Sequence, residues 1–317
     1  MSESGGSGSG DRPGFGRATS AVSAVYRDLV TTDGVAEFLD VRPQLFGIAY
    51  RMLGSVAEAE DVVQDAWIRW QRTNRDEVEN PAAFLTTTVT RLALTAATSA
   101  RARRETYPGA WLPEPVDTSD DPALGAERAE ALDLAVLLLL ERLSPAERAV
   151  YVLHEAFDYP YRRIGEILEI SEPHARQLAR RARLALESGR AAPAPPGLRR
   201  RLVETFAAAA RDGDLEALER LFTEDVAARA DGGGKVHVSR VDLHGVERVV
   251  LYLDNILRKF WSEASFTVVD ANGGGALLVT DAAGAPLAVL ALDVSGRGIE
   301  RVLFVVNPDK LRGFGRQ

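Results

Sequence analysis

Residues 143–186, "LSPAERAVYVLHEAFDYPYRRIGEILEISEPHARQLARRARLAL", indicate the fold most directly. Ser144, with Glu147 three positions later, predicts a capping box at the start of a first helix. A turn at Asp158–Pro160 leads to a short second helix, and Ser171 caps a third. Short helices joined by a tight turn in this way predict a helix-turn-helix unit.

The third of these helices has an apolar side and a basic side. Ala175, Leu178, Ala182 and Ala185 fall on one side at three- and four-residue spacing, while Gln177 and several arginines point elsewhere. A basic helix of this width fits the major groove of DNA. An ordinary helical bundle with a solvated arginine face gives the same pattern. The upstream sequence is therefore needed to distinguish a DNA-binding helix from such a bundle.

Residues 35–104 are also helical in pattern. Gly54 and Ser55 end one helix and cap the next, and Pro81 suits the first turn of a third. The middle helix has an apolar side opposite an acidic one, which carries Glu60, Asp61, Gln64 and Asp65. Such a face suits a basic protein surface, although on its own it is usually just solvated.

Two proline-rich linkers divide the chain. Residues 107–122, "YPGAWLPEPVDTSDDP", cannot form regular helix, and helices resume from Ala123. Residues 190–197, "RAAPAPPG", form the second linker. The pattern then changes to helices at 198–211, 215–222 and 245–259 and to the strands "SFTVVDA", "GALLVTDA", "PLAVLALDV" and "IERVLFVV". The order is therefore all-α, all-α and then α+β.

Composition narrows the class of protein. The net charge of −8 argues against unaided binding to nucleic acid, but arginines are bunched at 101–104 and 176–183. The chain has no cysteine, and we expect no metal and no cofactor. Its longest apolar run, at 135–140, is far shorter than the roughly 20 residues of a membrane span. With no secretory signal at the start, we expect a cytoplasmic protein that does not contact a membrane.

Five motifs together resemble one protein family. "YRMLGSVAEAEDVVQDAWIRW" followed by "NPAAFLTTTVTRLALTAATSARARRE" resembles region 2 of bacterial sigma factors of the extracytoplasmic-function (ECF) group, and residues 143–186 resemble region 4. "WLPEPV" (111–116), "DGGGK" (231–235) and "NPDKL" (307–311) are similar to motifs of a subgroup with a C-terminal SnoaL-like domain, a cone-shaped α+β fold. The resemblance covers residues 35–314.

The resemblance implies a multidomain chain with two all-α sigma domains and an α+β cone. The ranges that we expect are a Gly/Ser-rich disordered tail at 1–34, region 2 at 35–106, a linker at 107–122, region 4 at 123–189, a Pro-rich linker at 190–197 and the SnoaL-like domain at 198–317. It also implies a function: promoter recognition and transcription initiation with core RNA polymerase.

Site residues of region 2 follow from the same resemblance. Those expected to dock on the clamp helices of the polymerase β′ subunit are Asp61, Gln64 and Asp65. The loop at 72–80 would trap a base flipped from the −10 element. Those expected to face strand phosphates are Arg91, Arg101, Arg103 and Arg104. The family pattern Asn–Leu–Ala–Leu–Asp reads "RLALT" here, which puts the detailed −10 contacts in question.

Region 4 would contact the polymerase β flap and the −35 element. The candidates for reading base edges are His174, Arg176, Gln177 and Arg180. Arg181 and Arg183 are expected on phosphates. An arginine paired with guanine contributes about 1–3 kcal/mol of discrimination.

For the C-terminal cone, the resemblance implies regulation in cis, so that a separate anti-sigma factor is not required. A small-molecule ligand in the cone is also considered. Residues able to attempt acid/base catalysis there are Asp242, His244, His237 and Asp270. Neither histidine has an evident partner carboxylate, and His237 is placed in a strand, so we expect no enzyme.

The run "ADGGGKV" (230–236) raises the question of a phosphate cradle. A nucleotide-binding loop needs Gly, four residues and then Gly–Lys–Ser/Thr, and this spacing fails. The alternative from the residues alone is a hairpin turn. The resemblance suggests that the three motifs form one polar seam between the cone and the DNA-binding part, with Asp231 and Lys235 as charged points at a flexible corner. Its members would be Trp111, Pro113, Glu114, Asp231, Lys235, Asn307, Asp309 and Lys310.

Two other functions stay open. A stand-alone helix-turn-helix regulator with a ligand-sensing domain would bind duplex promoter DNA without polymerase. A SnoaL-type cyclase or isomerase with an accessory helical part would show turnover by the fragment 198–317.

Overall fold

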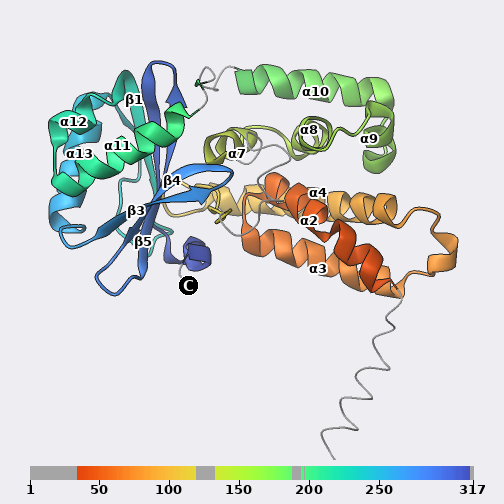
Figure 1. The fold of residues 1–317 in the computed structure, drawn as a ribbon. Helices are drawn as coiled ribbons and strands as arrows, with labels where there is room; N and C mark the ends of the chain where they lie inside the picture. The colour runs from red at the N-terminus through yellow and green to blue at the C-terminus, as the bar shows by residue number, and fades with distance from the viewer. Residues whose placement is uncertain (1–33, 119–132, 188–193, 196, 315–317) are drawn as a thin grey trace, which may run out of the picture.

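The computed structural model describes residues 34–118, 133–187, 194–195 and 197–314 (Figure 1). The predictions for the tail, for the start of helix at Ala123 and for most of the linker at 190–197 lie outside these residues. The expected fold class is confirmed, because two helical parts are followed by a domain built on a six-stranded sheet. We refer to residues 198–314 as the sheet domain. None of the helices in the described ranges is long and apolar enough to cross a membrane.

The first helical part contains α2 (Val35–Leu53), α3 (Val56–Arg72), the 3₁₀ turn η1 (Arg75–Glu77) and α4 (Pro81–Glu105). The residues predicted to end and to start its helices stand at the helix ends. Gly54 ends α2 in the left-handed conformation, with φ of 65°. The Ser55 side chain accepts a hydrogen bond from the Glu58 N–H at the start of α3, and Pro81 opens α4 behind an Asn80 cap.

The second helical part contains α7 (Leu134–Leu140), α8 (Pro145–Tyr151), the π-helical turn η2 (Val152–Ala156), α9 (Tyr161–Leu168) and α10 (Glu172–Glu187). The capping box of Ser144 and Glu147 is present. The predicted apolar side of α10 needs one correction. Ala185 is exposed and Leu186 is buried instead. Leu186 lies four residues after the buried Ala182, so it stays on the same face of the helix.

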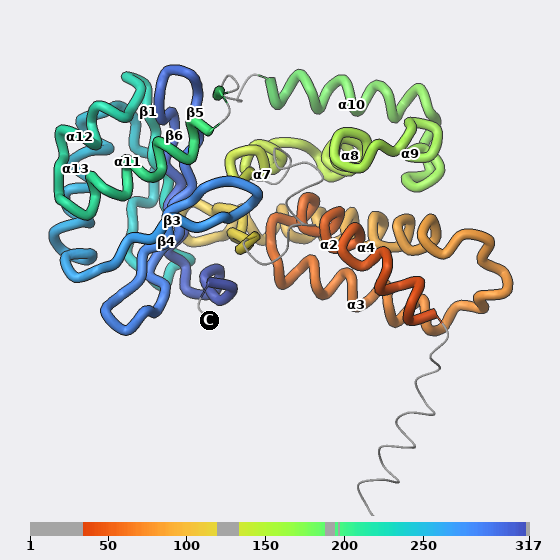
Figure 2. The backbone as a smooth tube through the Cα atoms, viewed as in Figure 1, coloured from red at the N-terminus to blue at the C-terminus, as the bar shows by residue number. Residues whose placement is uncertain are grey.

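The two helical parts pack on one another. Buried side chains of α2, α3 and α4 belong to the same apolar cluster as those of α8, α9 and α10. In Figure 2, α8 and α9 lie between α10 and α4. The α10 helix, predicted to read DNA, is therefore held on the outside of a closed helical body.

The sheet has the strand order β2-β1-β6-β5-β4-β3. Its strands are β1 (Phe222–Asp231), β2 (Leu243–His244), β3 (Ser265–Ala271), β4 (Gly274–Thr280), β5 (Pro286–Ser295) and β6 (Gly298–Val305). The β1–β6 pair is parallel and the other pairs are antiparallel. The domain's helices are α11 (Leu198–Asp212), α12 (Leu215–Glu219) and α13 (Val246–Lys259).

Two details of the sheet domain differ from the expectation. The helix expected at 215–222 ends at Glu219, and the chain continues as β1, which the alanine-rich "VAARA" did not reveal because alanine favours helix. His237 is not in a strand. It lies in an irregular segment after Lys235, because β1 has only the two-residue β2 as its outer partner.

Both faces of the sheet are covered. In β6, Val302 and Phe304 face the core shared with α11 and α13, whereas Leu303 and Val305 face the opposite side. That opposite side packs on Leu112, on α7 and on two C-terminal residues, Leu311 and Phe314. Leu311 follows the turn η3 (Pro308–Lys310), and Phe314 lies in η4 (Arg312–Phe314). The sheet domain is thus joined to the helical body through an apolar face rather than only by a tether.

Candidate functional site

The strongest polar contact between the parts of the molecule is made by Asp231, the last residue of β1. Its side chain is completely buried. The Tyr107 hydroxyl donates to Asp231 Oδ1 at 2.7 Å, and the Leu112 N–H donates to Oδ2 at 3.0 Å. Lys310 Nζ pairs with Oδ2 at 2.7 Å. One carboxylate therefore ties the linker at two points and the "NPDKL" turn at a third.

Lys310 contributes charge and packing to this junction. Its ammonium also donates to the Leu112 carbonyl and lies 4.5 Å from the centroid of the Trp111 ring. Burial lowers the pKa of Lys310, and the Asp231 carboxylate opposes that shift. The Tyr107 pKa is raised, first by burial and then by the hydrogen bond to Asp231. The Lys310 ammonium lies over aromatic rings. Because the site is buried, its electrostatic attraction to Asp231 is stronger than it would be in water.

The "DGGGK" run is a turn around this carboxylate. The Gly233 N–H donates to Asp231 Oδ1 at 2.9 Å, so the glycine amide binds the protein's own carboxylate. Gly233 has φ of 61°, and a Cβ there would lie 2.3 Å from Asn307 Nδ2. The expectation that Asp231 is a charged point at a flexible corner is wrong, because it is buried. Lys235 is exposed and pairs with Asp309 at 2.6 Å.

The "WLPEPV" segment extends the junction to the helical body. A Cβ on Gly54 would lie 2.7 Å from Trp111 Cη2 and 3.5 Å from Pro113 Cβ, so the segment packs on the turn between α2 and α3. The Glu114 carboxylate accepts a hydrogen bond from the Val56 N–H at 2.8 Å. The linker thus caps α3 with its own acid.

A second set of hydrogen bonds joins this end of the linker to the sheet. The Tyr50 hydroxyl donates to the Glu114 carbonyl at 2.6 Å and accepts from Asn272 Nδ2 at 2.7 Å. Asn272 Oδ1 accepts from the Val116 N–H at 3.0 Å. Of the predicted seam residues outside the linker, Asp231, Asn307 and Lys310 contact it, whereas Lys235 and Asp309 form a separate exposed pair. The structure adds Tyr50, Tyr107 and Asn272, which sequence reasoning missed.

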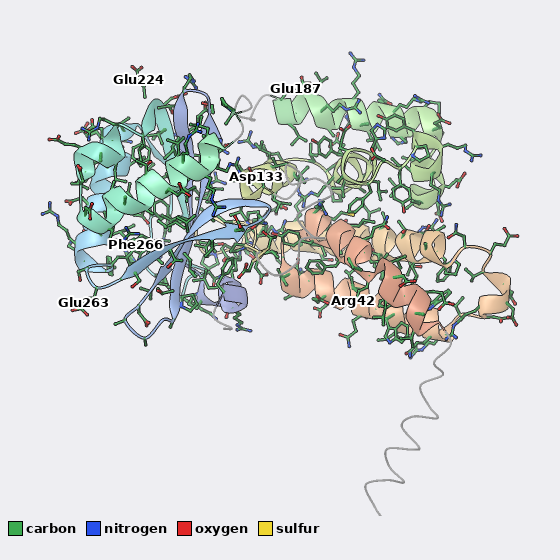
Figure 3. All side chains as sticks on the ribbon, viewed as in Figure 1. Arg42, Asp133, Glu187, Glu224, Glu263 and Phe266 are labelled. Atoms are coloured by element: carbon green, nitrogen blue, oxygen red, sulfur yellow. The ribbon has the colours of Figure 1, made fainter. Side chains whose placement is uncertain are left out.

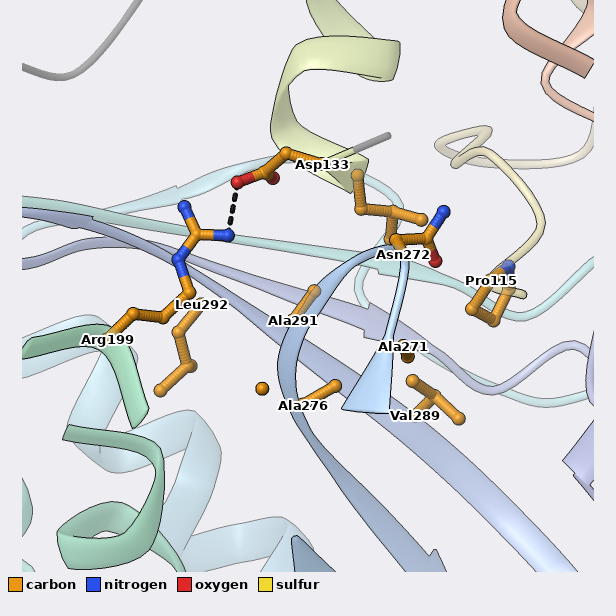
Figure 4. A pocket seen from close by; sticks show the side chains of 11 residues that line it. Pro115, Asp133, Arg199, Ala271, Asn272, Ala276, Val289, Ala291 and Leu292 are labelled. Atoms are coloured by element: carbon orange, nitrogen blue, oxygen red, sulfur yellow. Dashed lines mark ion pairs between the residues drawn. The ribbon is translucent and has the colours of Figure 1, made fainter. Parts of the chain in front are cut away.

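A further contact lies where α7 meets the sheet. Asp133 caps α7 and pairs with Arg199 of α11, beside a small pocket that Pro115 and Asn272 also line (Figure 4). Figure 3 shows Asp133 at the boundary between the sheet domain and the helices. The sheet domain therefore contacts the linker and α7 at the same time.

Glu114 gives this junction a pH dependence. Burial raises the Glu114 pKa, against the lowering effect of the hydrogen bonds from Val56 and Ser55. The docked linker therefore binds this proton more tightly than the free linker, whose glutamate has a pKa of about 4.3. We expect docking to be most stable below that value and to weaken as pH rises through the raised pKa. Hydrogen exchange at the Val56 amide, followed against pH, measures this, and Glu114→Gln should remove the slope.

A buried ionic cluster joins the two helical parts. Glu141, just after α7, pairs with Arg148 of α8 at 2.5 Å and with Arg104 of α4. The Arg148 side chain also donates to the Met52 carbonyl at 2.7 Å, and Arg104 donates to the Leu53 carbonyl and stacks 3.7 Å from the Trp111 ring centroid. No pattern in the sequence marks Glu141, because a lone acid after a short apolar helix is ordinary.

Three of the four region 2 arginines expected on strand phosphates are engaged within the protein. Arg91 donates to the Ile167 carbonyl at 2.8 Å and pairs with Glu169 at 2.9 Å, so it holds the end of α9. Arg103 pairs with Glu58, and Arg104 belongs to the cluster described above. Arg101 is exposed and makes no ion pair within the described residues.

The α10 side chains expected to read bases are exposed: His174, Arg176, Gln177 and Arg180. Arg176 pairs with Glu172 and lies 5.0 Å from the Tyr161 ring centroid. Arg181 pairs with Glu147 at 2.7 Å, and Arg183 with Glu155 at 2.6 Å. Arg176, Arg181 and Arg183 are thus all anchored on neighbouring acids, whereas Arg180 has no such partner within the described residues.

The acidic side of α3 is exposed at Asp61, Gln64 and Asp65. Gln64 also lines a groove of about 340 Å³ between α2 and α3, with Phe38 and Trp67 in its wall. This surface lies on helices anchored by the buried Trp70, whose indole N–H donates to the Gly34 carbonyl at 2.8 Å. The structure therefore presents the three side chains together on a rigid face.

The four candidates for acid/base catalysis do not converge. His237 lines the largest described cavity, of about 1050 Å³, which lies between α13 and the ends of β5 and β6. Asp242 pairs with Arg229 at 2.5 Å on the other side of the sheet, where His244 also lies, and Asp270 pairs with Arg200 at 3.2 Å. Burial tends to raise the Asp242 pKa, but Arg229 outweighs it and the pKa is lowered. No carboxylate lines the cavity among the described residues.

Comparison with known proteins adds an independent finding. The family model for Sigma-70 region 2 matches residues 38–103, and the model for Sigma-70, region 4 matches residues 133–186. The chain is 40% identical over 235 residues to the ECF RNA polymerase sigma factor SigJ of Mycobacterium tuberculosis (strain ATCC 25618 / H37Rv), a match that covers 71% of this chain and 74% of that protein.

Two further matches extend over more of the chain. It is 32% identical over 274 residues to the probable ECF RNA polymerase sigma factor SigI of Mycobacterium tuberculosis (strain CDC 1551 / Oshkosh), covering 85% of this chain and 92% of that protein. The crystal structure of the Mycobacterium tuberculosis extracytoplasmic function sigma factor SigJ superposes with a TM-score of 0.72 and 33% identity, covering 88% of this chain and 98% of that one. That superposition includes the sheet domain.

Proposed function

Since the chain belongs to the ECF RNA polymerase sigma factors and is similar to SigJ among them, we propose that its sheet domain controls in cis how readily the two helical parts open onto core RNA polymerase. The observation that carries this proposal is the buried Asp231, which fastens the linker between the helical parts to the sheet. A domain that holds the linker limits the separation of the parts that the linker joins.

The engaged arginines support the same proposal. Arg91, expected on promoter phosphates, donates to a carbonyl of α9 instead. Arg104 is enclosed by Glu141 and Trp111. For either guanidinium to reach DNA, the helical parts must separate. The closed arrangement is therefore the state that must be left before promoter binding.

Asp61, Gln64 and Asp65 supply the polymerase contact in this proposal. They remain exposed in the closed arrangement, so a first encounter with the β′ clamp helices does not require opening. Contact of the second helical part with the β flap and the promoter would follow. The sheet domain takes the role of a separate anti-sigma factor, and we assign it no reaction, since the cavity holds no acid/base pair among the described residues.

Arg180 and Arg181 provide a matched pair for promoter reading. Arg180 makes no hydrogen bond or ion pair within the described chain, whereas Arg181 is anchored on Glu147. We expect Arg180→Ala to reduce discrimination between −35 sequences by about 1–3 kcal/mol. Arg181→Ala should weaken all sequences alike. Competition between promoter variants for the polymerase holoenzyme distinguishes these effects, and equal losses from both variants would contradict the assignment.

The experiment that tests the function is run-off transcription on ECF promoters with core RNA polymerase. Full-length protein and a version ending at Gly197 are compared, each with and without core enzyme. We expect initiation only with core enzyme, and a changed yield on truncation. Specific promoter binding without polymerase would favour a stand-alone regulator. Turnover by the fragment 198–317 would favour an enzyme.

The large cavity suggests that a small ligand of the sheet domain regulates how readily the helical parts open. Its walls are mostly apolar, and Arg248 and Lys259 at its edge make no ion pair within the described residues. Pro308 and Leu311 of the "NPDKL" turn line it too, next to Lys310. We therefore expect an apolar molecule with a carboxylate, with decanoate as the probe. Calorimetry on the whole chain measures binding, and no heat at millimolar decanoate would refute it.

A further inference from the structure

A second cleft lies between the helical body and the sheet domain, on the opposite side of the sheet from the large cavity. Its volume is about 510 Å³, within the range of small-molecule sites. The lining comes from the end of α4, from Trp111, from the turn after α7 and from β1, β2 and β6. Whatever binds in it touches both parts that the linker joins.

The lining of this cleft is strongly basic. It contains five arginines and three carboxylates, a net charge of +2 with His244 neutral. The arginines are Arg101, Arg104, Arg142, Arg229 and Arg301. In a chain whose overall charge is −8, this local excess is of the opposite sign. The site therefore favours an anion by electrostatics alone.

The internal ion pairs leave the excess uncompensated. Glu141 is shared between Arg104 and the buried Arg148. Arg101 and Arg142 are exposed and make no ion pair within the described residues. Burial lowers the pKa of Arg148; Arg104 and Arg101 nearby lower it further, and Glu141 opposes the shift. Several guanidinium groups thus compete for one acid at this end of α4.

The sheet side of the cleft has a small side chain between two basic residues. Ala227 of β1 is paired in register with Arg301 of β6 on one side and with His244 of β2 on the other. Residues paired in this way lie on the same face of a sheet, and the alanine methyl leaves the middle open. Arg301 pairs with Asp293 at 3.6 Å, which is long for an ion pair.

We propose that this cleft binds a small anion with two or more phosphoryl groups, gripped by Arg101 and Arg142 on the helical side and by Arg301 and His244 on the sheet side. Guanidinium forks suit the paired oxygens of phosphate, and the excess of two charges matches a di- or triphosphate better than a single carboxylate. The anion is either an inorganic oligophosphate or the phosphate tail of a nucleotide. Bound there, it holds the closed arrangement, a consequence that rests on the proposed function.

Isothermal titration calorimetry on the whole chain at fixed ionic strength tests the binding. The probes are sodium tripolyphosphate, ATP and a short duplex DNA. We expect tripolyphosphate to bind at one site, and Arg142→Ala to weaken it at least tenfold. Arg201→Ala is the matched control, an exposed arginine on α11 outside the cleft, and it should leave binding unchanged. ATP binding more tightly than tripolyphosphate would identify a nucleotide.

Three results would overturn the proposal: no tripolyphosphate binding, equal losses from Arg142→Ala and Arg201→Ala, or duplex DNA binding that depends on Arg142 and is not displaced by tripolyphosphate. The regulatory consequence is measured apart from binding, as the effect of tripolyphosphate on the affinity for core RNA polymerase. We expect a weaker affinity for the wild type and no change for Arg142→Ala. If the anion binds and this affinity does not change, the proposed function fails while the site stands.

Discussion

Replacing Asp231 by alanine is expected to release the linker from the sheet domain. The change leaves the Lys310 ammonium buried without its carboxylate, and it removes the acceptor of the Tyr107 hydroxyl and of the Leu112 N–H. Breaking a buried pair in this way costs about 3–5 kcal/mol. Hydrogen exchange at the Leu112 amide should accelerate correspondingly, and the linker should become sensitive to proteases.

Two further variants distinguish release of the linker from a general loss of stability in the sheet domain. Tyr107→Phe removes one donor from the linker side alone, and we expect the same direction with a smaller loss of about 1–3 kcal/mol. Asp309→Ala breaks the neighbouring exposed pair with Lys235, which is worth about 0–1 kcal/mol. Unchanged exchange at Leu112 in both Asp231→Ala and Tyr107→Phe would show that the carboxylate does not hold the linker.

The second large effect is expected from Glu141→Ala. This change leaves Arg148 buried with an uncompensated charge and frees Arg104 from α7. The loss should again be about 3–5 kcal/mol, and it falls on the contact between the two helical parts. Urea unfolding followed by tryptophan fluorescence measures the change, and exchange at the α8 amides locates it.

Glu169→Ala is the control for this prediction. Glu169 also pairs across the two helical parts, with Arg91, but its side chain is 75% exposed. We expect at most about 1 kcal/mol from its loss. If Glu141→Ala costs no more than Glu169→Ala, burial of the cluster does not stabilise the closed helical body, and the ion pairs there are incidental.

Local rules of sequence predicted much of this fold. The capping box at Ser144, the left-handed Gly54 and the proline at the start of α4 all stand where hydrogen-bond geometry requires them. These signals work because each depends on residues only a few positions apart. The β1 strand was missed for the same reason, since its partner β6 lies far along the chain and its alanines favour helix locally.

The junction between the parts was predicted only in outline. The resemblance of three short motifs placed Asp231, Lys310 and Glu114 in one seam, but it could not show which charges are buried. Asp231 is enclosed while Lys235 remains in solvent, a difference made by how the linker packs over the end of β1. The Glu141 cluster gave no signal, because its partners lie on α4 and α8 and meet only after the helical parts close.

The residues expected to contact DNA were likewise predicted only in part. Arg91 departs from the family pattern, and sequence alone left its role open. Its guanidinium donates to a carbonyl at the end of α9, so in the closed arrangement it serves the contact between helical parts. A residue can hold the closed state and contact DNA in the open one, and no local pattern distinguishes these uses.

We propose that the sheet domain, through Asp231, holds the helical parts closed against polymerase. Because the chain has no cysteine, a single fluorophore can be placed on Glu79→Cys, an exposed position in the first helical part. Its anisotropy gives the equilibrium affinity for core RNA polymerase. We expect Asp231→Ala to bind core enzyme at least tenfold more tightly than the wild type, and Asp309→Ala to bind it like the wild type. Equal affinity of Asp231→Ala and the wild type would show that Asp231 does not hold the helical parts closed.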